Sequence, residues 1–208
     1  MTVAGLVLAA GASTRMGRPK QLAELDGRPL LEHALEALAA APLDEVVVAL
    51  GAGAGEVVQR VDLHGARPLV VAGWSAGMGH VLARAVAALG EPAAVVVCLG
   101  DQPLVGHKVV ARLVEAWRDG AGPVVAATYG GRLGNPKLFD RSILAHLRRL
   151  RGDTGARDLL GAHPEWVTPV EVGALGSDAD VDDEAALAGV ETMLRSAGAR
   201  GGVSRMVR

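Results

Sequence analysis

The sequence predicts a single α/β domain in which a mostly parallel sheet lies between two layers of helices, a three-layer α/β/α arrangement. Short apolar runs alternate along the chain with segments of helical periodicity, as in proteins built from β-α-β units. The apolar runs are continuous, which is typical of strands covered by helices on both faces. Half of the 208 residues are hydrophobic, enough for one sizeable core. We expect one domain over residues 1–197 and a disordered tail over residues 198–208.

Five apolar runs are predicted to be strands of the sheet. They are Val3–Ala9, Glu45–Leu50, Leu69–Ala72, Ala94–Leu99 and Val124–Thr128. The helices expected between them are Pro29–Leu38, Val81–Leu89 and Val109–Trp117. Pro29 suits the first position of a helix, and the leucines and alanines that follow it form one apolar stripe. The alternation of strand and helix implies right-handed crossovers between parallel strands.

The rhythm changes after residue 128. Residues 129–136 are rich in turn formers, and residues 137–139 form a short apolar piece, so we expect a small β excursion from the sheet. Glu165–Val172 is predicted to be a further strand, and Glu184–Leu194 a closing helix. In open α/β sheets, ligands bind beyond the carboxyl ends of the strands. The residues that directly follow the strands are therefore the candidates for function.

Composition and charge limit the classes of partner. The net charge of −2 gives no overall attraction to nucleic acid or to anionic membranes, and aromatic residues make up only 2% of the chain. The chain has one cysteine, Cys98, no basic segment typical of a signal peptide, and no apolar run of the roughly 20 residues that a membrane helix needs. We expect a cytoplasmic protein that acts on small molecules, with no nucleic-acid or membrane partner.

A glycine-containing loop follows the first predicted strand. It runs from Leu8 to Lys20 with the sequence LAAGASTRMGRPK. Gly11 and Gly17 permit tight turns and a close approach of the backbone to a ligand. Successive backbone N–H groups in such a loop form a cradle for anions, and Arg15 and Lys20 add two positive charges. The loop suits a triphosphate; the alternative is a plain βα turn with two solvated basic side chains.

Acidic residues stand at two further places. Asp101 follows the fourth predicted strand in the sequence Gly-Asp-Gln-Pro, and a carboxylate there suits Mg²⁺, which prefers oxygen ligands. The alternative is that Asp101 caps the next turn. Near the end of the chain, Asp180 and Asp182 project to the same side if the backbone is extended. Asp182 or Asp183 is also suited to capping the final helix, and the two roles are compatible.

Taken together, these motifs resemble the NTP-transferase family that includes molybdenum cofactor cytidylyltransferase and molybdenum cofactor guanylyltransferase. The resemblance spans about residues 3–195, and the order of five motifs is more specific than any one of them. The five segments are the triphosphate loop at 8–20, the metal motif at 100–103, two later motifs of the cytidylyltransferase branch at 132–139 and 151–157, and the acid pair at 180–182.

The resemblance implies a nucleotide-diphospho-sugar transferase-like fold and a role for each matching residue. The implied catalytic residues are Arg15, Lys20 and Asp101. The implied nucleotide-binding residues are Ala10, Gly11, Ala12, Ser13, Arg15, Lys20, Gly73, Gly77 and Asp101. The implied Mg²⁺ ligands are Asp101 and Asp182, with Asp180 adjoining. The residues implied to face the acceptor are Asn135, Asp153, Gly155 and Arg157.

The implied reaction moves a nucleoside monophosphate, CMP in preference, from an NTP to molybdopterin or its molybdenum-loaded form and releases pyrophosphate. One alternative keeps this chemistry with GTP or another acceptor, and the family's serine-rich segment after Met78 is here Gly79-His80. A dinucleotide-binding oxidoreductase is a second alternative, although the glycines of 51–55 lack the required spacing. The third is a non-catalytic nucleotide-binding partner of a molybdoenzyme or its maturation factor.

Overall fold

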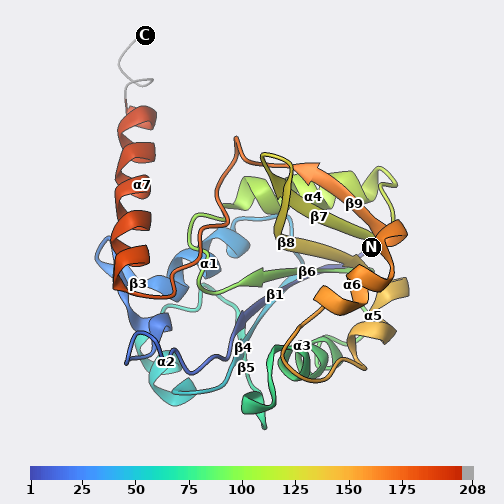
Figure 1. The fold of residues 1–208 in the computed structure, drawn as a ribbon, viewed down its shortest axis with the longest axis horizontal. Coiled ribbons are helices and arrows are strands. Elements are labelled where there is room, and N and C mark those ends of the chain that lie inside the picture. Colours follow the sequence, from blue (N-terminus) through green and yellow to red (C-terminus); the bar gives the residue numbers. More distant parts are fainter. Residues whose placement is uncertain (203–208) are drawn as a thin grey trace.

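In a computed structural model of the protein, the backbone is described for residues 1–202 and the side chains for residues 1–196. The main sheet of this part has seven strands in the order β5-β4-β1-β6-β8-β7-β9 (Figure 1). The strands are β1 (Val3–Ala9), β4 (Glu45–Leu50), β5 (Arg67–Val70), β6 (Ala94–Leu99), β7 (Val124–Tyr129), β8 (Arg132–Asp140) and β9 (Val167–Glu171). Neighbouring strands are parallel except where β8 pairs with β6 and β7, so the predicted mostly parallel sheet is confirmed.

Helices cover both faces of the sheet and confirm the three layers. One face carries α1 (Leu30–Ala39), α2 (Ala54–Arg60) and α4 (His107–Arg118). The other carries α3 (Met78–Ala87), α5 (Arg141–Leu147) and α6 (Arg157–Ala162). The strands are apolar throughout because successive side chains enter opposite cores: in β1, Leu6 packs on the α3 side and Val7 on the α1 side.

The segment after residue 128 differs from the expected excursion. It forms a hairpin whose second strand, β8, lies inside the sheet between β6 and β7. The reason is that Leu138 and Phe139 are both fully buried and pack into the cores on opposite faces, as strand residues covered on both sides do. Pairing with β6 is confined to residues 137–140 of β8, so residues 132–136 of β8 pair only with β7 or not at all.

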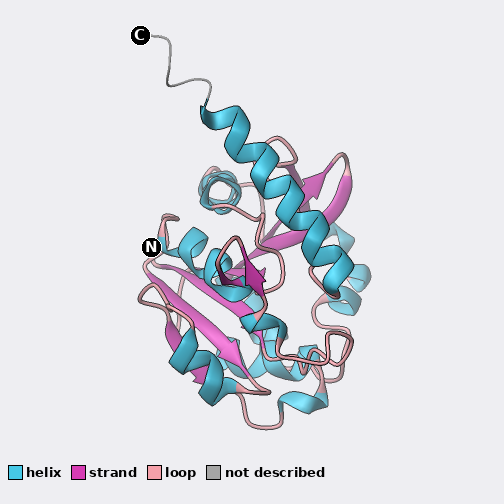
Figure 2. Ribbon diagram, turned by 90° about the vertical axis from the view of Figure 1, so that its left-hand side faces the viewer, coloured by secondary structure: helices cyan, strands magenta, loops and turns pink. Residues whose placement is uncertain are grey.

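The remaining elements are short except for α7. They are the strands β2 (Glu24–Leu25) and β3 (Arg28–Pro29), the 3₁₀ helices η1 (Lys20–Leu22), η2 (Trp74–Ala76) and η3 (Pro164–Trp166), and α7 (Glu184–Gly202). Leu187 and Val190 of α7 pack against Leu30 and Val181, and beyond this contact the helix extends away from the sheet (Figures 1 and 2). The helix thus reaches past the predicted end at Leu194, and residues 203–208 of the expected tail lie outside the described residues.

No helix in residues 1–202 combines the length and the apolar character needed to cross a membrane.

The hairpin tip is held by one carboxylate. Glu171 at the end of β9 accepts hydrogen bonds from the backbone N–H groups of Gly130 and Gly131 and from the Thr128 hydroxyl, each at 3.0 Å. These hydrogen bonds, led by the one from Gly131, lower the pKa of Glu171 to about 2. A carboxylate stabilised in this way stabilises the fold fully above its ordinary pKa of 4.5, and the effect is lost as the pH falls to about 2.

We expect Glu171→Gln to lower the melting temperature at pH 7 and to speed hydrogen exchange at the Gly130 and Gly131 amides, because a neutral amide oxygen is a weaker acceptor than a carboxylate. The difference in melting temperature from wild type should shrink as the pH falls from 4.5 towards 2. Glu24→Gln, at an exposed glutamate of β2, is the control. A difference that persists unchanged at low pH would contradict the assigned role of the carboxylate.

Candidate active site

The loop after β1 presents unpaired backbone donors. Within the described residues, the N–H groups of Gly11, Ala12 and Ser13 donate to no other group. The carbonyls on the inner side of the loop are fixed by Gln21, a buried side chain that donates to the oxygens of Ala9 at 2.7 Å and Gly11 at 3.2 Å. A Cβ at Gly11 would meet no protein atom, so the fold itself does not require glycine there. The arrangement leaves three N–H groups accessible to an anion.

The basic and acidic residues of the predicted site are paired with one another. The Lys20 ammonium lies 2.5 Å from Asp101 Oδ2 and 3.0 Å from Asp182 Oδ1. Arg15 lies 3.0 Å from Asp182 Oδ2, although its side chain is largely exposed. Burial alone would lower the pKa of Lys20, but the two carboxylates outweigh it and raise that pKa. The hydrogen bond from Lys20 in turn lowers the pKa of Asp182.

The same acids offer oxygen ligands to a divalent cation. Asp101 Oδ1 is buried and makes no hydrogen bond within the described part of the chain, which suits a metal ligand better than a turn cap. Asp180 lies close to the pair, and burial, followed by the charges of Asp101 and Asp182, raises its pKa. Residues 1–196 contain no group of three or more His, Cys, Asp or Glu side chains arranged around one metal position. A site for Mg²⁺ here would therefore use one or two carboxylates together with substrate phosphates, the usual arrangement for this ion.

The residues of the acidic segment 180–183 have different hydrogen-bond partners and therefore different roles. Asp183 Oδ1 accepts from the backbone N–H of Ala186 at 2.8 Å and so caps α7, which leaves Asp182 for the site. Gln102, a buried glutamine, donates to Asp180 Oδ1 at 2.8 Å. The backbone N–H of Val181 donates to the carbonyl of Asp101 at 2.9 Å, which fixes the acidic segment against the end of β6.

A cavity of about 290 Å³ opens beside the loop, near the lower end of the ~300–1,000 Å³ range of ligand pockets. It is lined by Leu8, Ala9, Ala10, Gly11, Lys20, Gln21, Trp74, Ser75, Gly77, Met78, Val81, Leu99, Gly100, Asp101 and Asp153. The predicted glycines shape its wall: Gly73 has φ 69° at the start of η2, and a side chain at Gly77 would collide with the carbonyl of Gly152. Of the expected nucleotide-binding residues, Ala10, Gly11, Lys20, Gly77 and Asp101 line this hollow at the carboxyl ends of β1 and β6, whereas Ala12, Ser13, Arg15 and Gly73 are not among its lining residues.

The residues expected to face the acceptor fall into two groups. Asp153 and Gly155 lie on the nucleotide side: Asp153 Oδ1 accepts from the Met78 N–H at 3.3 Å, and Gly155, with φ 59°, lies against the Met78 side chain. Asn135 lies on the hairpin, where its side-chain oxygen accepts a hydrogen bond from Lys137 Nζ at 2.8 Å. Arg157 is exposed at the first turn of α6. Within the described residues, no hydrogen bond or ion pair joins any two of the four side chains.

Packing accounts for Gly79-His80, which stands where the resembled family has a serine-rich segment. A side chain at Gly79 would approach the carbonyl of Arg151 to 2.7 Å, which is too close. His80 Nε2 lies 3.0 Å from the carbonyl of Ala72 and ties α3 to the loop after β5. Neither residue is among those that line the cavity.

Two supporting residues of the site were not singled out by the sequence patterns: Gln21 and Gln102. Each is a polar side chain that follows an expected motif or lies inside it, and this placement is the only signal that the sequence offers for them. Gln21 and Gln102 are both buried. The sequence pattern predicts the motifs, but it does not reveal which amide side chains beside them point into the protein.

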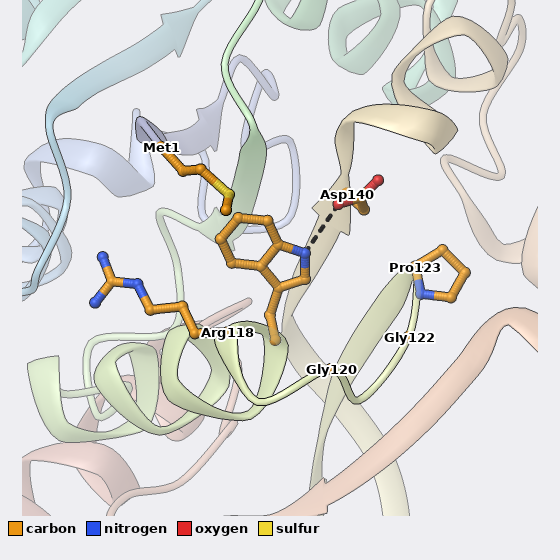
Figure 3. A pocket seen from close by; sticks show the side chains of 7 residues that line it. Met1, Arg118, Gly120, Gly122, Pro123 and Asp140 are labelled. Carbon is orange, nitrogen blue, oxygen red and sulfur yellow. Dashed lines mark hydrogen bonds between the residues drawn. The ribbon is translucent and has the colours of Figure 1, made fainter.

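A second cavity lies at the opposite end of the sheet, where Met1 precedes β1 and Pro123 precedes β7 (Figure 3). Two of its polar side chains are engaged: Trp117 Nε1 donates to Asp140 Oδ2 at 3.0 Å, and Asp140 Oδ1 accepts from Ser142. None of the predicted site residues line it, so it has no part in the chemistry proposed below.

Comparisons with known proteins agree with this arrangement. Residues 5–166 match the MobA-like NTP transferase domain. Nicotine blue oxidoreductase of Paenarthrobacter nicotinovorans is 35% identical over 86% of this chain and 92% of its own length. The crystal structure of an Rv0371c homologue from Mycobacterium sp. strain JC1 is 30% identical, with a TM-score of 0.83 over 93% of this chain and 97% of that one. Rv0371c of Mycobacterium tuberculosis H37Rv in complex with manganese is 30% identical, with a TM-score of 0.74 over 87% and 94% of the two chains.

These likenesses extend over nearly the whole of the described fold, including the loop after β1 and the motif after β6. They also confirm the expected nucleotide-diphospho-sugar transferase-like architecture. The chain belongs to the MobA-like NTP transferase domain family.

Proposed function

We propose that this protein is a Mg²⁺-dependent nucleotidyltransferase that transfers a nucleoside monophosphate, CMP in preference to GMP, to molybdopterin or its molybdenum-loaded form. The observation that carries the proposal is that Lys20 contacts both Asp101 and Asp182 beside a loop whose three backbone N–H groups have no acceptor among the described residues. Membership of an NTP transferase family supports the reaction class. The manganese complex of the Rv0371c relative supports a divalent cation. We place the reaction in the cytoplasm, in line with a single buried cysteine.

We expect the charged side chains of the site to change their ion-pair partners when the substrate binds. In the structure, Lys20 and Arg15 are paired with the carboxylates of Asp101 and Asp182. A triphosphate in the loop would draw the two cations towards its phosphates, and Asp101 and Asp182 would then hold Mg²⁺. Mg²⁺, when bound, neutralises phosphate charge. Lys20 and Arg15 would offset the charge that develops on the leaving pyrophosphate.

The chemistry needs no nucleophile from the protein. A phosphate oxygen of the acceptor attacks the α-phosphorus in line, the bond to the β-phosphate oxygen breaks, and pyrophosphate leaves. The contribution of the chain is to fix both substrates and to stabilise charge, as in other phosphoryl-type transfers. Cys98 takes no part, because it is fully buried and burial raises its pKa to about 12.

A second candidate is an oxidoreductase, favoured by the 35% identity to nicotine blue oxidoreductase. In that case the cavity would hold a reduced dinucleotide. The glycines at 51–55 give it little support, since Gly51 faces the carbonyl of Ala10 and the ring of Trp74 and so serves packing. Oxidation of NADH or NADPH with nicotine blue as acceptor, measured beside pyrophosphate release, separates the two candidates. The third alternative, a non-catalytic partner of a molybdoenzyme or its maturation factor, predicts nucleotide binding without either reaction.

In competition between equimolar CTP and GTP, with Mg²⁺ and molybdopterin present, we expect kcat/KM to favour CTP ~100-fold or more, about 3 kcal/mol. A site built to hydrogen-bond one base leaves buried groups unpaired with another. Mass spectrometry of the dinucleotide product gives the ratio. Preferential incorporation of GMP would overturn the cytidylyl assignment and leave the reaction class standing. No incorporation of either nucleotide with any pterin acceptor would count against the class itself.

A further inference from the structure

Lys137 is a half-buried lysine in the middle of the sheet for which the mechanism above has no role. It lies opposite Val97 of β6 and opposite Ala126 of β7. Residues opposite one another on paired strands share a face, so Lys137 projects on the side of Val97, which packs with α3 and α5. Leu99, two residues after Val97, lies on that face too and lines the cavity.

The contacts of Lys137 direct its ammonium towards the site. Nζ donates to the carbonyl of Gly134 and to Asn135 Oδ1, both at 2.8 Å. Gly134 and Asn135 precede Lys137 in an antiparallel strand, so the side chain turns towards the carboxyl end of β6, where Asp101 lies. Both partners are neutral, and no carboxylate of residues 1–196 lies within 4.0 Å of Nζ. An ammonium has three donors, so one remains for a ligand.

The surrounding charges do not neutralise this ammonium. Asp178 is the acid that acts on it most, but its carboxylate is engaged at 2.6 Å by Arg132. Arg157, from α6, adds a second positive charge that acts on Lys137, and it forms no ion pair within the described residues. Burial, supported by Arg157 and opposed by Asp178, lowers the pKa of Lys137 to about 8. A desolvated cation without an anionic partner costs stability, which is a pattern found at functional sites.

We propose that Lys137 and Arg157 form an anion subsite that binds the phosphomonoester group of the acceptor. The assignment of this anion to the acceptor rests on the proposed function; the presence of a phosphate subsite does not. Asn135 would act as a positioning residue, because its side chain holds the Lys137 ammonium in place. Lys137 forms no covalent bond in this role: it binds and orients the phosphate whose oxygen attacks the nucleotide.

The chain contains only three lysines, Lys20, Lys108 and Lys137, so each can be observed separately. In protein grown with ¹³C,¹⁵N-labelled lysine, the terminal CH₂–NH₃⁺ group of each lysine gives its own NMR signal, assigned with single Lys→Arg variants. We expect the Lys137 signal to titrate near pH 8 and its midpoint to rise by a unit or more in saturating inorganic phosphate. The exposed Lys108 should not respond, and Arg157→Gln should weaken the response of Lys137. A Lys137 signal that is indifferent to phosphate would overturn the subsite.

Kinetics test the assignment to the acceptor. We expect Lys137→Gln to raise the KM for molybdopterin at least ~10-fold, about 1.4 kcal/mol, while the KM for CTP stays unchanged. Lys137→Arg should restore most of the loss, and wild-type kcat/KM for the acceptor should fall as the pH rises through about 8. If Lys137→Gln folds normally and leaves the acceptor KM unchanged, the assignment is wrong. If wild type itself shows no transfer, the proposed function fails, and the phosphate titration still decides the subsite.

Discussion

Asp101→Asn is expected to reduce nucleotidyl transfer at least ~100-fold while the protein stays folded. Asp101 follows β6 and has one oxygen on the Lys20 ammonium at 2.5 Å, while the other is buried and has no hydrogen-bond partner among the described residues. Asparagine keeps the shape and removes the charge, so both the attraction to Lys20 and the affinity for a divalent cation should fall. The backbone contact of Asp101 with Val181 does not involve the side chain and should persist.

Pyrophosphate release as a function of Mg²⁺ concentration measures this effect, and circular dichroism checks the fold. Asp119→Asn, the same change at an exposed aspartate after α4, is the matched control and should behave like wild type. A higher Mg²⁺ requirement in Asp101→Asn, together with the lower rate, would support a ligand role. Turnover close to wild type would remove Asp101 from the active site.

Most of the fold could be predicted because burial on both faces leaves a local signal in the sequence. The strands at Val3–Ala9, Glu45–Leu50 and Ala94–Leu99 are continuous apolar runs, and the structure has them with the predicted bounds. The sequence could not place β8, because its glycine, asparagine and proline are turn formers. Its position between β6 and β7 depends on Leu138 and Phe139 filling cores made by distant helices, which no local pattern reveals.

Part of the candidate site could likewise be predicted from the sequence, and part could not. The loop after β1 and Asp101 after β6 could be predicted as candidates, because ligand residues in such sheets follow the strands directly. The ion pair of Lys20 with Asp182 joins residues 162 positions apart and follows only from the path of the acidic segment. Lys137 has the appearance of an exposed strand residue, and its burial depends on β8 being an inner strand.

Lys20→Ala should produce the second large effect, because Lys20 is the one side chain of the described structure that contacts both Asp101 and Asp182. Its ammonium is mostly shielded from solvent, so water compensates for its loss only in part. Removing it leaves two nearby carboxylates without a shared cation and the triphosphate loop without its most enclosed positive charge. We expect transfer to fall ~10²–10³-fold, the range seen when a single preorganised electrostatic contact is lost.

Thermal stability gives this prediction a readout besides turnover. With the ammonium gone, Asp101 and Asp182 repel each other, and a divalent cation relieves that repulsion. We therefore expect Mg²⁺ or Mn²⁺ alone to raise the melting temperature of Lys20→Ala more than that of wild type, where Lys20 competes for the same oxygens. Lys108→Ala, at an exposed lysine of α4, is the matched control and should follow wild type in both assays. Wild-type turnover in Lys20→Ala, with no added response to the cation, would show that Lys20 serves only to close the loop.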